Sequence, residues 1–154
     1  MRLLIDGDAC PDRQKVIELA LHYGVEVLLF IDFAHVIEDE RIQIIMCEVG
    51  KDSVDQMILS YLREGDLLIS QDYGLASLAL LKKVTILHVS GKRITEDNIN
   101  NLLTSRYLGH LSRKQHKHVK GSKKRNYRTT QFFLRELEKI FIENKINEEK
   151  AILE

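Results

Sequence analysis

The stretch RLLIDGDACP, residues 2–11, contains the local pattern on which the fold prediction rests. Residues 2–6 are apolar apart from their two ends, which is typical of a short strand buried in a sheet. Pro11 suits the first turn of a helix because that turn needs no backbone N–H at this position, and a helical pattern continues over residues 11–23 to Gly24. A strand that leads into a helix is the repeating unit of α/β proteins.

The same alternation of strand and helix continues along the chain. Further strands are predicted at residues 25–31, 41–49, 67–70 and 84–89, and further helices at residues 53–64, 75–81, 95–103 and 129–144. Such crossovers are right-handed, so we expect a mostly parallel sheet with helices on both faces. The 154 residues fit one domain, which we place at residues 1–144, with residues 145–154 as a fraying tail.

The composition favours a protein of the reducing cell interior. The apolar runs are much shorter than the roughly 20 residues that cross a bilayer, so we expect no membrane association. Cys10 and Cys47 are the only cysteines, too few for a framework of disulfides. We therefore expect a cytoplasmic location.

Acidic side chains follow three of the predicted strands. Asp6 and Asp8 follow the first strand, Asp55 lies near the start of the helix after the third, and Asp72 follows the fourth. Because the carboxyl ends of parallel strands meet at one edge of a sheet, we expect these four acids to converge. Carboxylates, water and substrate phosphate are the ligands that Mg²⁺ and Mn²⁺ prefer. The pattern predicts a catalytic, metal-binding site suited to phosphoryl chemistry.

Helix capping is the alternative explanation for these acids, because each of them also precedes a helix. We assign Asp52 to the cap of the helix at residues 53–64 and Asp55, on its first turn, to the site. Asp6 lies too early to cap the helix at Pro11, so a structural role for it is hard to supply. Ser70 is expected either to orient a metal ligand or a water, or to bond to the local backbone.

A strongly basic segment follows the predicted sheet. Residues 98–135 contain ten Lys and Arg and no Asp or Glu, although the whole chain has a formal net charge of zero. Within a basic arm at residues 106–128, His and Tyr are interleaved with candidate nucleic-acid-binding residues: Arg113, Lys114, Lys117, Lys120, Lys123, Lys124, Arg125 and Arg128. Phosphate neutralisation combined with aromatic stacking is typical of binding to single strands, so we expect a nucleic-acid partner, RNA before DNA. A solvated loop without a partner is the alternative.

Four segments together resemble the YaiI/YqxD family of bacterial proteins, which is related to the PIN-like nuclease domains: IDGDACP (5–11), GKDSVDQMI (50–58), GDLLISQDYGLASLAL (65–80) and KGSKKR (120–125). The resemblance covers nearly the whole chain. It implies a PIN-like three-layer α/β/α sandwich with a C-terminal basic arm and helix. It also matches Asp6, Asp8, Asp55 and Asp72 to the acidic cluster in which PIN-like nucleases hold a divalent metal. Gly7 stands where the family often has Ala, a change that removes no ligand.

The leading hypothesis is a phosphodiesterase that uses Mg²⁺ or Mn²⁺ to cleave RNA or single-stranded nucleic acid. A non-catalytic nucleic-acid-binding protein of the same fold is the second hypothesis, in which the acids are a vestigial or structural cation site. A third is a haloacid-dehalogenase-like phosphatase, with Asp6 as nucleophile and Asp8 as general acid. The third pattern matches less well, because Cys10 stands where Thr or Val is usual.

Overall fold

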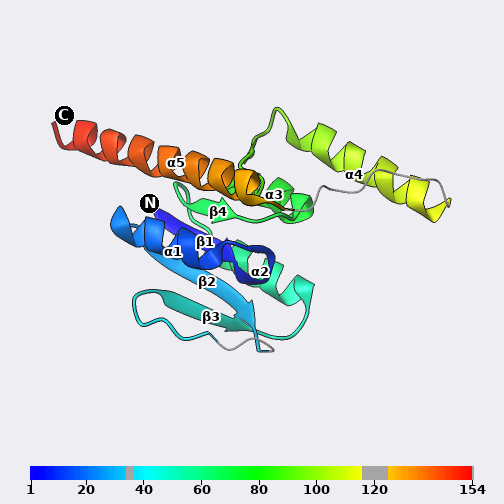
Figure 1. The fold of residues 1–154 in the computed structure, drawn as a ribbon, viewed down its shortest axis with the longest axis horizontal. Coiled ribbons are helices and arrows are strands. Elements are labelled where there is room, and N and C mark those ends of the chain that lie inside the picture. The colour runs from blue at the N-terminus through cyan, green and yellow to red at the C-terminus, as the bar shows by residue number, and fades with distance from the viewer. Residues whose placement is uncertain (34–36, 116–124, 154) are drawn as a thin grey trace.

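The computed structural model describes residues 1–33, 37–115 and 125–153, and it shows a six-stranded sheet between two layers of helices (Figure 1). The strands are β1 (Arg2–Asp6), β2 (Glu26–Asp32), β3 (Gln43–Cys47), β4 (Leu67–Ile69), β5 (Thr85–Leu87) and β6 (Arg93–Ile94). The helices are α1 (Arg13–His22), α2 (Lys51–Tyr61), α3 (Tyr73–Ala79), α4 (Ile99–Lys114) and α5 (Tyr127–Leu153), with short 3₁₀ helices η1 (Gly7–Ala9) and η2 (Leu80–Lys82). The predicted three-layer α/β/α fold is confirmed.

The sheet has the strand order β3-β2-β1-β4-β5-β6, and every neighbouring pair is parallel except β5 and β6. β1 pairs with β2 on one side and with β4 on the other, so that Ile5 lies between Leu29 and Ile69. The chain adds β2 and β3 on one side of β1 and then crosses back to add β4 on the other. Ligands of open α/β sheets bind at such a reversal, outside the carboxyl ends of the strands.

Helices α1 and α5 cover one face of the sheet. Successive residues of a strand point to opposite faces, and Leu3 and Leu29 belong to the core on this side. Ile17 of α1 and Phe133 of α5 are buried in the same core. The sheet therefore holds the first and the last helix of the chain against one surface.

Helices α2 and α3 cover the other face. Ile58 and Ala76 are buried there in one core with Leu4 and Phe30 of the sheet. α4 joins this core through Ile99 in its first turn and then extends away from the sheet (Figure 1). Most of its later side chains are exposed.

Several boundaries differ from the sequence predictions. α2 begins at Lys51, because Gly50, with φ of 131°, turns the chain directly into the helix. α4 runs to Lys114 and makes the first part of the basic arm helical. α5 continues to Leu153, where a fraying tail is predicted, and its end is rich in good helix formers. No described helix is both long and apolar enough to span a membrane.

Gly7 lies where the end of β1 comes closest to β2. A Cβ at this position would lie 2.6 Å from Ile31 Cγ2 and 2.7 Å from the Phe30 carbonyl oxygen. The carbonyl oxygen can move only if the backbone of β2 moves, so glycine fits here without distortion and a side chain does not. Since Gly7 separates Asp6 from Asp8, its contact with β2 fixes the turn that carries both acids.

We expect Gly7→Ala to lower the free energy of unfolding by about 1–3 kcal/mol, the usual cost of overpacking a filled site. Gly109→Ala on α4 is the matched control, because its added Cβ would lie 3.8 Å from its nearest neighbour, Arg113 Nη1. That control should raise stability by up to about 1 kcal/mol, since alanine favours a helix. Urea denaturation of the three proteins measures both effects, and a Gly7→Ala protein as stable as wild type would contradict the close contact.

Candidate acidic site at the carboxyl ends of the strands

The carboxyl ends of the central strands carry a set of polar side chains. Asp6 is the last residue of β1, Asp32 is the last residue of β2, and Ser70 directly follows β4. Parallel pairing brings these positions to one rim of the sheet. The rim predicted from the sequence is therefore present.

A cavity of ≈ 490 Å³ opens at this rim. Four carboxylates from three parts of the chain line it: Asp6, Asp8, Asp32 and Asp55. Asp55 reaches the cavity because its neighbour Val54 is buried in the core and anchors the first turn of α2. The structure thus brings together three of the four predicted acids and adds Asp32. We call this cavity the acidic cavity.

The carboxyl group of Asp6 is buried and strongly perturbed. Its side chain is 7% exposed, and its pKa is raised to about 6, first by burial and then by the charge of Asp55. Asp8 and Asp72 raise the same pKa further, while the hydroxyl of Ser70 lowers it by donating a hydrogen bond of 3.3 Å to Asp6 Oδ2. Asp6 makes no capping bond to η1. Capping is therefore not the role of Asp6.

Asp72 caps α3, which is the alternative explanation that the sequence offers for these acids. Its Oδ1 accepts a hydrogen bond of 3.1 Å from the backbone N–H of Leu75 at the start of α3. The same oxygen lies 3.8 Å from Arg106 Nη1. Asp72 is not among the residues that line the acidic cavity, although its charge acts on Asp6. It therefore stands at the edge of the site, between the acids and α4.

Asp52 does not cap α2, so this part of the prediction is wrong. The N-cap position belongs to Gly50, and Asp52 lies exposed within the first turn of the helix. The helix begins earlier than the sequence pattern indicates, which moves Asp52 from the cap into the helix. Its negative charge there still suits the positive end of the helix dipole.

Asp32 is the acid that sequence reasoning missed. It directly follows the apolar run at residues 25–31, as Asp6 follows the apolar part of β1, so the same signal was present in the sequence. Cys47, at the end of β3, reports the same negative field: burial and then the charges of Asp8 and Asp32 raise the pKa of its thiol. The field of the acids therefore extends to the end of β3.

The acidic cavity offers carboxylate oxygens to a divalent cation. In the described ranges, 1–33, 37–115 and 125–153, no group of three His, Cys, Asp or Glu side chains is arranged to hold a metal ion. Mg²⁺ keeps several of its waters and needs only one or two direct carboxylates. The acidic cavity fits a hydrated ion of this kind better than an ion enclosed by protein ligands.

Comparison with known proteins identifies the family of the chain. Residues 4–143 match the profile of the family described as "Uncharacterized BCR, YaiI/YqxD family". The chain belongs to the YaiI/YqxD family.

Curated relatives of this YaiI/YqxD chain carry the name UPF0178 protein, which states no reaction. Those of Natranaerobius thermophilus and Lachnoclostridium phytofermentans are each 39% identical to it, over 82% and 81% of this chain and 86% of each relative. A UPF0178 protein of Bacillus cereus is also 39% identical, over 80% of this chain and 86% of its own length. No solved structure matches.

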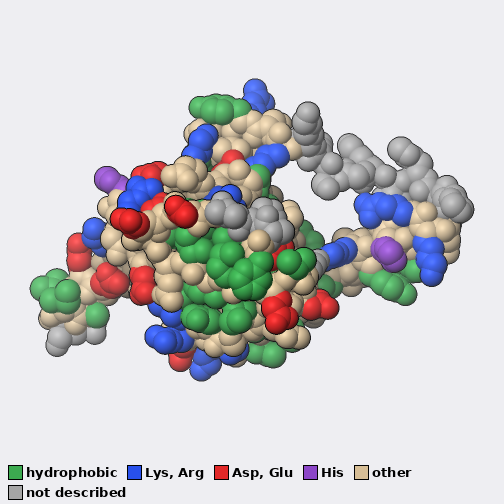
Figure 2. Space-filling view, turned by 90° about the horizontal axis from the view of Figure 1, so that it is seen from below, with side chains coloured by type: hydrophobic (Ala, Val, Ile, Leu, Met, Phe, Trp, Pro, Cys, Tyr) green, Lys and Arg blue, Asp and Glu red, His purple; other side chains and the backbone are tan. Residues whose placement is uncertain are grey.

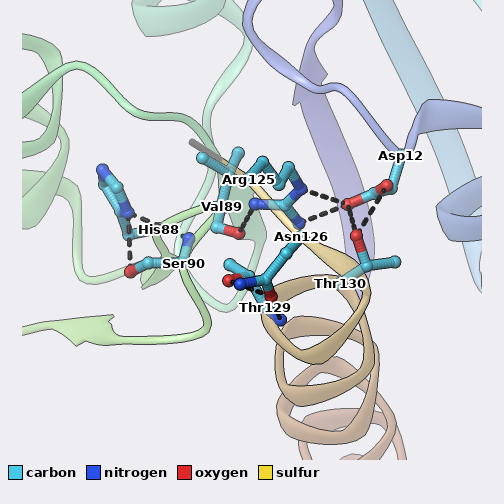
Figure 3. Close-up of polar contacts among 8 residues, drawn as sticks. All are labelled: Asp12, His88, Val89, Ser90, Arg125, Asn126, Thr129 and Thr130. Atoms are coloured by element: carbon cyan, nitrogen blue, oxygen red, sulfur yellow. Dashed lines mark hydrogen bonds and ion pairs between the residues drawn. The ribbon is translucent and has the colours of Figure 1, made fainter. Parts of the chain in front are cut away.

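The basic residues predicted to bind nucleic acid fall into three groups in this YaiI/YqxD chain. Arg113 and Lys114 are exposed on α4, whose Lys and Arg side chains are visible on the projecting part of Figure 2, and Arg128 is exposed on α5. Lys117, Lys120, Lys123 and Lys124 lie outside the described residues. Arg125 binds the protein itself: its guanidinium contacts Asp12 and the Val89 carbonyl oxygen (Figure 3). We therefore leave Arg125 out of the nucleic-acid surface.

The raised pKa of Asp6 predicts how the stability of this YaiI/YqxD chain depends on pH. Between its ordinary pKa of 3.8 and about 6, the native state binds more protons at Asp6 than the unfolded state does. Wild type therefore gains stability from this group as the pH falls from 7.5 toward 4. Asp6→Asn should be the more stable protein at pH 7.5, by up to about 3 kcal/mol, and this advantage should roughly halve at pH 5.

Urea denaturation at the two pH values tests this prediction. Asp52→Asn is the control, because its side chain is exposed outside the acidic cavity, and its difference from wild type should stay small at both. An Asp6→Asn protein that is less stable than wild type at pH 7.5 would show that the Asp6 carboxylate stabilises the fold, contrary to this account.

Proposed function

We propose that this chain is a PIN-like, divalent-metal-dependent phosphodiesterase of the cytoplasm that acts on RNA or other single-stranded nucleic acid. One observation carries the proposal: Asp6 is buried at the end of β1, caps no helix, and shares a cavity with three other carboxylates. Acids held together against their mutual repulsion cost stability. A buried carboxyl group with a strongly raised pKa in a cavity, like that of Asp6, is typical of a functional site.

Mg²⁺ or Mn²⁺ is the cofactor that the donors suit, because hard cations prefer carboxylate oxygens. Asp6, Asp8 and Asp55 would hold the ion, and Asp32, which lines the same cavity, would bind its waters. A bound ion would supply neutralisation of the charge on the scissile phosphate and activation of a water. Ion binding would also offset the burial and the repulsion by Asp55 that together raise the pKa of Asp6.

The residues around the acids support this chemistry. Ser70 fixes Asp6 through its hydroxyl, and Ser70 Oγ in turn accepts a hydrogen bond of 3.0 Å from the backbone N–H of Asp72. This chain of two bonds links the ends of β1 and β4 and holds the Asp6 carboxylate in one orientation. Arg113 and Lys114, exposed on α4, would neutralise phosphates of a bound strand.

One observation favours a second candidate, a nucleic-acid-binding protein without catalysis. The described side chains include no ready-made group of three metal ligands. In that case the basic surface of α4 would bind the strand, and the acids would hold at most a structural cation. Turnover separates the two candidates, because binding is expected of both.

The test uses a fluorescently labelled single-stranded RNA with Mn²⁺ or with EDTA. We expect wild type to cleave the RNA only with Mn²⁺. Asp6→Asn and Asp55→Asn should each reduce the rate about 100-fold or more, because a lost carboxylate leaves the ion misplaced relative to the phosphate. Asp52→Asn is the matched control for Asp55→Asn, because both residues lie on α2, and it should cleave the RNA at the wild-type rate.

Two outcomes would contradict the proposal. If wild type binds the RNA but does not cleave it with Mn²⁺, the non-catalytic candidate is correct. If Asp52→Asn loses as much activity as Asp55→Asn, the acidic cavity is not the reaction centre. Thermal melts supply a readout independent of substrate, since Mn²⁺ should stabilise wild type and Asp52→Asn more than Asp6→Asn.

A further inference from the structure

A second cavity, of ≈ 500 Å³, lies next to the acidic cavity. Gln71, on the loop that follows β4, lines both of them. The other walls come from Tyr73 at the start of α3, His88 after β5, Arg106 on α4, and Arg125 before α5. Its volume is in the usual range of small-molecule sites, about 300–1,000 Å³. We call it the Arg106 pocket.

Arg106 supplies an exposed cation to the lining of the pocket and forms a long ion pair with Asp72. Its side chain is 54% exposed, and its Nη1 atom lies 3.8 Å from Asp72 Oδ1, beyond hydrogen-bond distance. The guanidinium therefore stays near the rim but keeps N–H donors that can turn toward the pocket. A planar guanidinium binds phosphate oxygens in pairs, which gives orientation as well as attraction.

Tyr73 and His88 supply two stacked aromatic rings to the lining of the pocket. Their rings are stacked, with centroids 5.3 Å apart and planes at 28°. His88 Nδ1 accepts a hydrogen bond of 3.0 Å from the backbone N–H of Ser90 (Figure 3), which places the proton of the neutral ring on Nε2. Burial, and then the charges of Arg125 and Lys92, lower the pKa of His88. A neutral ring held in this way is suited to stacking.

Arg125 holds the walls of the pocket in place. It donates a hydrogen bond of 2.8 Å from Nε to Asp12 Oδ2 and one of 2.6 Å from Nη1 to the Val89 carbonyl oxygen (Figure 3). Asp12 also accepts a bond of 3.2 Å from Thr130 Oγ1 on α5. These bonds join the start of α1, the turn after β5 and the start of α5. The shape of the pocket is therefore fixed by the fold.

We propose that the Arg106 pocket is a nucleotide-binding subsite, in which Arg106 binds the phosphate of one nucleotide and the Tyr73–His88 pair stacks with its base. The inference rests on the proposed function, because Gln71 places the pocket beside the acids, where an adjoining phosphate of the same strand would lie. A base that stacks on the protein must leave its own helix, so the ligand is single-stranded.

Binding of adenosine 5′-monophosphate in EDTA, measured by calorimetry, tests the subsite without any cleavage. Wild type should bind this nucleotide more tightly than adenosine or inorganic phosphate. Arg106→Gln should weaken binding of the nucleotide about tenfold and leave adenosine unaffected, because only the phosphate contact is lost. Arg135→Gln is the matched control, since Arg135 is an exposed arginine that lines a different groove.

The stacking half of the proposal has its own variants. Tyr73→Leu should weaken the binding of the nucleotide and of adenosine alike, about tenfold. Tyr73→Phe should keep the wild-type affinity because it keeps the aromatic ring. If Tyr73→Leu does not fold, proton NMR of the nucleotide with wild type replaces it. Stacked base protons shift upfield on binding, and unshifted base protons would overturn the stacking.

The results also separate this inference from the proposed function. Unchanged nucleotide affinity in Arg106→Gln overturns the subsite even if Mn²⁺-dependent cleavage is found. Inorganic phosphate that binds as tightly as the nucleotide overturns it as well. A tenfold loss in Arg106→Gln supports the subsite even if wild type cleaves no RNA.

Discussion

Because β1 pairs in parallel with β2 on one side and with β4 on the other, the carboxyl ends of three strands meet at one rim of the sheet. This pairing places Asp6 beside Asp32 and Ser70, and the crossover through α2 adds Asp55 to the same rim. The close contact of Gly7 with β2 then fixes Asp8. The pairing of β1 thus sets the rim, and α2 and the Gly7 turn bring the remaining acids to it.

Acidic and basic side chains lie in separate regions around this rim, and they affect the stability of the protein differently. Burial and neighbouring carboxylates oppose ionisation of Asp6, so the acidic cavity lowers the stability of the metal-free protein near neutral pH. The basic residues of α4 are exposed and free of that cost. Asp72 and Arg106 lie where the two regions meet. An acidic cavity beside a basic helix supports the proposal of a single-stranded nucleic-acid substrate and a divalent cation.

Sequence patterns predicted the parallel sheet, its two helical layers and the convergence of Asp6, Asp8 and Asp55, because strand ends in such folds are defined by local residues. Asp32 also stands at the end of an apolar strand, β2, but the sequence prediction did not include it. Asp72 caps α3 and also lies near Arg106. The capping role has a local sequence pattern, whereas the contact with Arg106 has none. The pairing of Arg125 with Asp12 spans 113 positions, so no pattern within one element could show that this cation is used by the fold.

The central claim is that the acidic cavity binds a divalent cation, and a crystal grown with Mn²⁺ tests it most directly. Anomalous scattering measured at the manganese absorption edge locates the ion without reference to any activity. The account predicts an anomalous peak inside the acidic cavity, in contact with Asp6, Asp8 or Asp55 directly or through one water. Saturating Mn²⁺ with no peak in that cavity, or with peaks only on other surfaces, would contradict it.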